Sequence, residues 1–469
     1  MNLSIDGTQM GAGDPGFAEP GGPGAVDEEP PPGTIVRPED ETVVDEEVCQ
    51  FIDPGDAPLR RLTGDAYHAS VRDLFPGVTI PTQSFSPDER IANFEANTVA
   101  KVTILLAEEY QRAAEEISAI VVPTLSETLP ADADEATVRS FITDLGTRAF
   151  RRRVDEAEVT ALYELYNTGR TQIDGDTGAR MVIEAILQSP MFLYRLEEGE
   201  EGTGDVVPLN DFAIASRLSY FLWGTTPDQT LLDAATQGQL STREEVEAHA
   251  RRMLEDPRAR ARINGAFEEW MRIDELAEVE KPDPAFDEAM KASMIAETEA
   301  FIDHVIWETD GSITDLLTAN YTFVDANTAA VYGVSAGDSA DGLVRVDLPA
   351  DRRGILSQPG VLAAHGHGQM PIHRGKFVRD AFFCSAPPPP PDTIVPLETY
   401  EGESMRSKAE KRMAARTEGC AGCHLQMDGL GLVFDMYDEM GRYRTEDEFG
   451  NALSSAGAIL KTSGYPGFT

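Results

Sequence analysis

The sequence contains 469 residues, of which 41% are hydrophobic and 7% aromatic, so it can form about three domains of ordinary size. Asp and Glu number 82 against 39 Lys and Arg, and the formal charge of −43 repels nucleic-acid phosphates and anionic lipid surfaces. The chain has no apolar run of about eighteen residues. We therefore expect no nucleic-acid partner and no membrane span. Solubility is the simplest reason for the acidity, although a cationic redox partner would also suit it.

Residues 1–48 are rich in Pro, Gly, Asp and Glu and contain one Arg, which predicts a disordered acidic tether. Such a tether would suit a protein held at a cell surface, for example by a lipid attached upstream of the present sequence. An inert tail is an equal alternative. Residues 1–10 lack the basic flank and the apolar stretch of a secretory leader, which taken literally predicts a cytoplasmic protein.

Three segments begin with a capping residue and continue with apolar residues at helical spacing. The caps are Thr63, Asp155, which forms a capping-box pattern with Glu158, and Asn210. The apolar residues on the three helices are Tyr67, Val71 and Leu74; Leu162, Leu165 and Tyr166; and Ile214, Leu218, Phe221 and Leu222. Helices therefore dominate, and residues 343–348 (LVRVDL) are the best candidate for a strand.

Changes in composition divide the chain into six predicted segments, and the run of five prolines at 387–391 predicts a stiff polyproline rod at one boundary. The segments are a tether (1–48), an N-terminal helical domain (49–125), a small helical domain (126–200), a helical domain (201–335), a connecting domain that ends in the rod (336–391) and a C-terminal domain (392–469). In the last segment we expect a helix through Met405 and Met413, followed by a cysteine motif.

This motif is C-x-x-C-H, formed by Cys420, Cys423 and His424, and it is the pattern of c-type haem attachment. On one helical turn the two thiols can reach the two vinyl groups of a haem while the adjacent imidazole ligates the iron. We therefore expect one covalent haem c with His424 as the proximal ligand. A zinc site, a thioredoxin-like redox pair and a short disulfide are the alternatives, and zinc is the main one.

The sixth iron ligand has several candidates. We single out Met436, Met440, Met370 and His367, and we also note Met405, Met413, His365 and His373. Met427 lies on the same turn as His424 and would point to the same side of the ring. A methionine ligand would favour electron transfer, whereas an open position would permit ligand binding or oxidation. Each methionine is otherwise explained as a core residue.

Three further patterns have both a functional and a structural interpretation. Cys49 and Cys384 remain after the haem pair and form a candidate disulfide. Residues 364–376 gather three histidines beside Arg374 and Lys376, which suggests contact with a haem, a metal or an acidic group; a buried loop is an equal alternative. The triplet 151–153 (RRR) is typical of a solvated helix end.

Taken together, the sequence resembles the planctomycete-type cytochrome c multidomain family, which consists of secreted bacterial proteins built of adjoining domains of unknown function. The resemblance covers most of residues 49–469, and the C-x-x-C-H motif is part of it. The other matching stretches are 58–63 (PLRRLT), 71–74 (VRDL), 149–152 (AFRR), 188–195 (QSPMFLYR), 216–223 (SRLSYFLW), 353–356 (RGIL), 373–378 (HRGKFV), 427–428 (MD) and 441–444 (GRYR).

The resemblance implies a mainly α, exported protein with a helical multidomain body, followed by a small cytochrome-c-like helical domain. It implies no settled reaction. Members usually begin with an export leader and continue beyond the position of Thr469, so we expect a leader removed or a start chosen downstream, and a last domain cut short. The expected location is periplasmic, cell-surface or secreted.

Three functions follow from these patterns. The first is a single-haem cytochrome that transfers electrons to a redox partner protein. The second is a haem-dependent oxidase or peroxidase acting on an extracellular substrate, with His365, His367 or His373 near an open iron face. The third is a non-enzymatic surface or binding protein in which C-x-x-C-H holds zinc or a disulfide. No Walker loop, GxGxxG after a strand, GxSxG elbow or HExxH pair is present, so nucleotide and hydrolase chemistry are unsupported.

Overall fold

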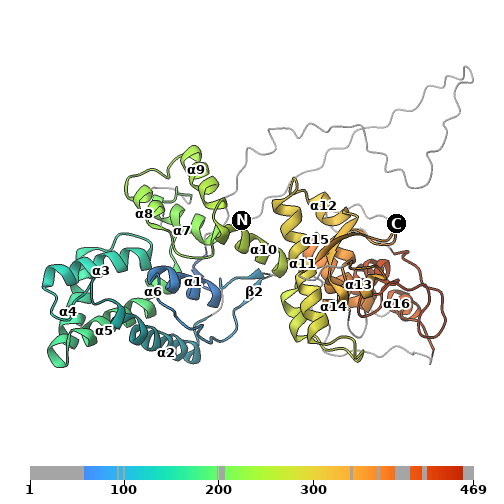
Figure 1. Ribbon diagram of the computed structural model, residues 1–469, viewed down its shortest axis with the longest axis horizontal. Helices are drawn as coiled ribbons and strands as arrows, with labels where there is room; N and C mark the ends of the chain where they lie inside the picture. Colours follow the sequence, from blue (N-terminus) through green and yellow to red (C-terminus); the bar gives the residue numbers. More distant parts are fainter. Residues whose placement is uncertain are drawn as a thin grey trace, which may run out of the picture. The chain divides into compact units, whose positions relative to one another are not determined.

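The computed structural model describes residues 58–91, 94–98, 101–197, 199, 206–337, 342–366, 370–385, 402–414 and 420–457 (Figure 1). These residues all belong to one compact unit that spans Asp56–Thr469. The predicted tether, the polyproline run, Cys49 and His367 lie outside the described residues. Within them the protein is mainly α, as the sequence predicts, and its strands form three two-stranded sheets.

The first group of helices shares one apolar core that lies within residues 62–220. Its elements are β1 (Arg60–Arg61), α1 (Gly64–Leu74), β2 (Arg90–Ile91), β3 (Phe94–Glu95), α2 (Ile104–Val121), α3 (Glu135–Phe150), α4 (Glu156–Gln172), α5 (Gly175–Gln188), α6 (Pro190–Leu193) and β4 (Tyr194–Arg195). The hydroxyl of Thr63 caps α1 by accepting a hydrogen bond from the backbone N–H of Ala66 at 3.2 Å. Asp155 and Glu158 form both hydrogen bonds of a capping box at the start of α4. Both predicted helix starts are therefore confirmed.

The next four helices surround a smaller core. They are α7 (Asp211–Leu222), α8 (Gln229–Thr236), α9 (Arg243–Leu254) and α10 (Pro257–Met271). Asn210 caps α7 as predicted. The predicted apolar face of α7 is wrong at Phe221, whose side chain is 73% exposed. The helix instead buries Tyr220, because its hydroxyl bonds Ser70 of α1 and its ring joins the first core.

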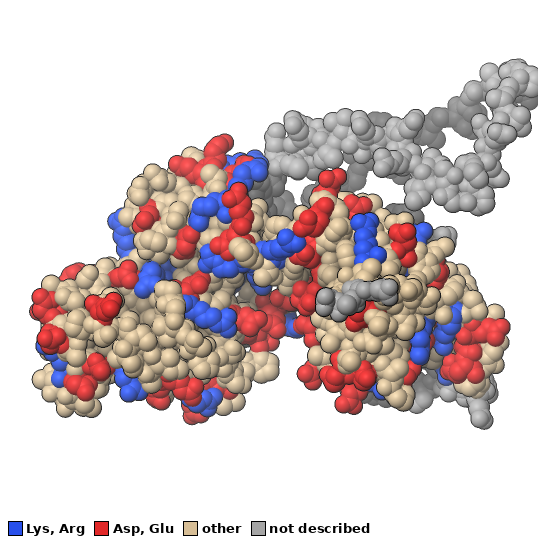
Figure 2. All heavy atoms as spheres, in the orientation of Figure 1, with Lys and Arg blue, Asp and Glu red and all other residues tan. Residues whose placement is uncertain are grey.

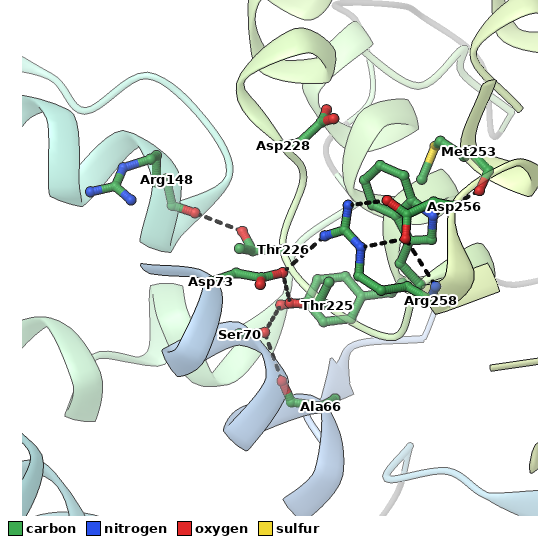
Figure 3. Close-up of polar contacts among 12 residues, drawn as sticks. Ala66, Ser70, Asp73, Arg148, Thr225, Thr226, Asp228, Met253, Asp256 and Arg258 are labelled. Atoms are coloured by element: carbon green, nitrogen blue, oxygen red, sulfur yellow. Dashed lines mark hydrogen bonds and ion pairs between the residues drawn. The ribbon is translucent and has the colours of Figure 1, made fainter. Parts of the chain in front are cut away.

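Residues of α1 and α10 are joined through a polar cluster beside α7 (Figure 3). The carboxylate of Asp73 accepts a hydrogen bond from the hydroxyl of Thr225 at 2.9 Å and lies 3.3 Å from a guanidinium nitrogen of Arg258. Arg258 also pairs with Asp256, which caps α10. These contacts tie the first helical group to the second.

The remaining elements lie around a third core within residues 271–440 and a separate small cluster of Val324, Ala329 and Tyr332. They are η3 (Asp274–Glu278), α11 (Glu288–Trp307), α12 (Ile313–Thr318), β5 (Tyr321–Val324), α13 (Ala326–Tyr332), β6 (Val344–Asp347), η4 (Ile355–Ser357), α14 (Pro359–Ala364), α15 (Met370–Phe383), α16 (Met405–Ala414), α17 (Cys420–Gly431) and η5 (Leu432–Phe434). The predicted strand is confirmed as β6, which pairs antiparallel with β5. The predicted domain boundaries stay predictions, but residues on both sides of the proline run contribute to this one core.

Two glycines set the close packing of α15 on α17. A Cβ atom on Gly375 would lie 1.8 Å from the carbonyl oxygen of Met427, and one on Gly431 would lie 1.7 Å from that of Pro371. Any larger side chain would push the helices apart, so both positions require glycine. The crossing fixes α17, which carries the cysteine motif, against α15.

One predicted surface feature lies inside the fold. Arg151 is 3% exposed and ends α3 in a left-handed conformation, so its interpretation as part of a solvated helix end is wrong. Its guanidinium donates hydrogen bonds to the carbonyl oxygens of Met191, Phe192 and Tyr194. Burial is tolerated because these carbonyls satisfy the donors.

Charged side chains of both signs are interspersed over the face shown in Figure 2, with Asp and Glu widespread. This distribution fits a solubilising role for the acidic residues. None of the helices in the described ranges is both long and apolar enough to cross a bilayer.

Candidate functional site

The motif begins helix α17, which starts at Cys420. The side chain of Cys423 is half-buried and that of His424 is 23% exposed. The side chain of Cys420 lies outside the described part of the structure, so the relation between the two thiols stays a prediction. The helix places Cys423 and His424 on its first two turns.

His424 is held by a buried carboxylate one helical turn later. Its Nδ1 lies 3.2 Å from Oδ1 of Asp428, and Asp428 is fully buried. A carboxylate accepts, so Nδ1 is the donor in this contact, and a neutral ring then keeps its lone pair on Nε2. Histidines that ligate metals usually hold their second nitrogen in this way. The contact fixes the orientation of the His424 ring and leaves Nε2 outside it.

The other oxygen of Asp428 binds Arg412 of α16. The Nε atom of Arg412 donates to Oδ2 at 2.8 Å, and the side chain is 10% exposed. An unpaired buried carboxylate would be costly, and this ion pair offsets that cost. The Nη2 atom of Arg412 is also buried, and no described residue is its hydrogen-bond partner. It is a donor beside the His424–Asp428 pair.

The candidate distal ligands have different surroundings. Met440 is 1% exposed and belongs to the third core, and Met370 is 8% exposed at the start of α15. Met436 is half-buried, and its carbonyl accepts a hydrogen bond from the backbone N–H of Arg444. His367 lies outside the described residues. None of these positions identifies a sixth ligand, so all four stay predictions.

The histidine-rich stretch folds largely into the interior. His365 is 7% exposed, its Nε2 lies 3.1 Å from the carbonyl oxygen of Met271, and its ring stacks on Phe377 with centroids 3.7 Å apart. This fits the alternative of a buried loop whose histidines satisfy backbone groups. Lys376 pairs with Asp380 along α15.

Arg374 of the same stretch is a structural brace. It is 3% exposed, and burial lowers the pKa of its guanidinium to about 10. Its nitrogens donate to four carbonyl oxygens, those of Leu362, Phe434, Tyr437 and Asp438. Since its donors are used by the backbone, Arg374 fixes the segment after α17 rather than offering itself to an anionic ligand.

The other cysteines, and other residues of metal-binding types, do not extend the site. Cys384 is exposed, and its predicted partner Cys49 is not among the described residues, so their disulfide stays a prediction. Across the side chains that the structure describes, no three His, Cys, Asp or Glu residues gather as metal ligands.

Sequence reasoning missed Asp428 as the partner of His424 and Arg412 as the partner of Asp428. The spacing of four residues between His424 and Asp428 on one helix was a usable signal, because such residues face each other. Arg412 had no such signal, because α16 reaches α17 only through tertiary packing.

Four protein-family models match the chain in sequence order. Each is described as a protein of unknown function: PSD3 (DUF1587) at 60–123, PSD5 (DUF1595) at 137–197, PSD4 (DUF1592) at 209–334 and PSCyt3 (DUF1588) at 352–447. The chain belongs to the planctomycete-type cytochrome c multidomain family. The PSCyt3 match of this family member contains α16, α17 and the C-x-x-C-H motif. No curated protein and no solved structure matches it.

Proposed function

We propose that this protein is an extracytoplasmic, single-haem c-type cytochrome that transfers electrons. Cys420 and Cys423 would hold the haem as thioethers, and Nε2 of His424 would ligate the iron. The contact between Nδ1 of His424 and Asp428 is the observation that carries the proposal, because it prepares the imidazole as a metal ligand before any cofactor is present.

The residues around His424 fit a haem. A haem carries anionic propionates, and the buried Nη2 of Arg412, which has no partner among the described residues, could donate a hydrogen bond to such a group. The same Arg412 neutralises Asp428, so the site needs no further cation. The haem itself would supply one-electron redox chemistry.

Asp428 would also tune the ligand electronically. A carboxylate bonded to Nδ1 makes the imidazole a stronger donor through Nε2, which favours the more oxidised metal. Arg412 draws charge from the other carboxylate oxygen and limits this effect. The balance between these two contacts would set the reduction potential from the His424 side.

The family and the charge support an exported redox protein with a protein partner. The PSCyt3 model carries a cytochrome name. The sequence resembles a family of secreted proteins. A charge of −43 would favour a cationic redox partner through long-range attraction, so we expect electron transfer to slow as salt is added.

The test uses the full chain behind an export leader in a bacterial host that matures c-type cytochromes. We expect a visible haem spectrum that stays with the protein after denaturation and acid-acetone extraction. The variant C420S/C423S should lose covalent colour, whereas C384S should keep it. Extractable colour or a colourless, zinc-containing chain would overturn the proposal. Rapid binding of carbon monoxide or cyanide would favour an oxidase or peroxidase over a carrier.

A further inference from the structure

Two arginines face each other across the short β1–β4 sheet. Arg60 and Arg195 are direct partners in this antiparallel pair. Like charges placed opposite each other on neighbouring strands are destabilising. The chain has more than twice as many acidic as basic residues, so a carboxylate partner would be the expected neighbour. The pairing therefore needs another explanation.

Arg195 is poorly compensated where it lies. It is half-buried, and burial lowers the pKa of its guanidinium, with Arg60 and Arg151 acting in the same direction. Its guanidinium carbon lies 5.3 Å from the ring centroid of Tyr220. Within the described residues the side chain of Arg195 makes no hydrogen bond and no ion pair, although a guanidinium has five N–H donors.

The groups around Arg195 are already engaged elsewhere. The hydroxyl of Tyr220 is bonded to Ser70 at 2.8 Å and to Arg151 at 3.3 Å. The carboxylate that attracts Arg195, Glu197, is held through both oxygens by Arg217. Within the described residues, no carboxylate therefore pairs with the side chain of Arg60 or Arg195.

We propose that Arg60 and Arg195 form a binding site for the oxyanion group of a ligand, either a carboxylate or a phosphate or sulfate. The planar fork of a guanidinium matches two oxygens of such a group, and a second guanidinium opposite it strengthens the attraction. Exposed Arg60 meets the ligand from solvent, while half-buried Arg195 anchors it against Tyr220. A bound anion would also remove the repulsion across the sheet.

The net negative charge of the protein makes anion binding a discriminating test of this site. A protein with a net charge of −43 repels anions in general, so weak nonspecific binding is suppressed. Saturable binding of a small anion would therefore have to come from a local site. Cation–π contact of Arg195 with Tyr220 alone predicts no such binding.

The test is calorimetric titration of the full chain with inorganic phosphate, sulfate and acetate, with chloride holding the ionic strength constant. We expect saturable binding, and the preferred anion distinguishes a phosphate or sulfate group from a carboxylate. R195Q and R60Q should each weaken binding at least about tenfold, since a charge-assisted contact is lost. The control R251Q removes an exposed arginine of α9 that pairs with Glu247 and should bind normally.

A second readout covers variants that fold poorly. In buffer without these anions, R60Q should have a higher Tm than the wild-type chain because it relieves the repulsion at Arg195. Adding the anion that the wild-type chain prefers should not raise the Tm of R60Q further. No saturable binding of any of the three anions by the wild-type chain would overturn the proposal. Equal binding by wild type and both variants would also overturn it.

Discussion

His424 and Asp428 face each other on one turn of α17, with Nδ1 and Oδ1 3.2 Å apart. Asp428 is fully buried, and its second carboxylate oxygen accepts a hydrogen bond from Arg412. Three residues from two helices thus form one row of polar contacts that ends at Nδ1 of His424 in the motif. These contacts form independently of any cofactor, so their structural role can be tested separately from their proposed redox role.

Replacing Asp428 with Asn should affect both roles. D428N removes a buried charge and leaves Arg412 without its carboxylate, so we expect a loss of about 3 kcal/mol in the free energy of unfolding, measured with urea. In the haem-loaded protein the reduction potential should rise, because the imidazole becomes a weaker donor. The control E410Q alters an exposed carboxylate of α16 and should leave both quantities unchanged. A D428N protein with wild-type stability would argue against the buried pair.

The glycine crossing predicts a large effect from one methyl group. G375A would place a Cβ 1.8 Å from the carbonyl oxygen of Met427, so we expect at least about 2 kcal/mol of destabilisation by urea unfolding. The matched variant G265A adds a methyl to helix α10, where nothing lies within 4 Å. It should be neutral or stabilise by about 0.5–1 kcal/mol, since Ala favours helix. Similar effects of the two variants would contradict the crossing.

Glu297 should make stability depend on pH. It is fully buried on α11, and burial raises the pKa of its carboxyl to about 7. One oxygen accepts hydrogen bonds from Thr322 and Tyr332, while the other has no partner among the residues that the structure describes. The carboxyl therefore binds a proton in the folded state at a pH where the unfolded chain has released it.

The sign follows from this difference in proton binding. The contribution of Glu297 to stability is complete below about pH 4.5 and is lost as the pH rises through about 7. E297Q should remove this slope and be more stable than wild type at pH 8 by roughly 2 kcal/mol. Glu268, whose pKa burial also raises to about 7, keeps its own slope in both proteins. Parallel stability curves for wild type and E297Q between pH 4.5 and 8 would refute the assignment.

The brace formed by Arg374 should not tolerate lysine. A lysine cannot reach the four carbonyl oxygens that the guanidinium fork contacts, so R374K would leave buried acceptors unpaired. We expect about 3 kcal/mol of destabilisation in thermal or urea unfolding. R353K changes the exposed neighbour of buried Arg352 and should cost less than about 0.5 kcal/mol. Equal costs for both would contradict the brace.

Local signals predicted the helix starts well. Thr63, Asp155 and Asn210 cap helices because each bonds backbone N–H groups within three residues, and this chemistry does not depend on the rest of the fold. The strand at β6 was likewise visible from its alternation. The site could be predicted only in part. The C-x-x-C-H motif is recognisable in the sequence, whereas the residues that support it, Asp428 and Arg412, were not predicted.

The misses share a physical cause. Phe221 is exposed and Arg151 is buried because contacts with α1, α6 and β4 decide which face of each segment is covered. Arg412 reaches Asp428 from another helix, 16 positions away. Burial and pairing of this kind depend on tertiary packing, which periodicity within one segment does not encode.

The most direct test of the central claim is peptide mass spectrometry of the full chain after export from a host that matures c-type cytochromes. The account predicts that the peptide containing Cys420, Cys423 and His424 carries the mass of one haem, and that the C420S/C423S variant lacks it. An unmodified peptide, from a host that loads its own cytochromes normally, would contradict the account.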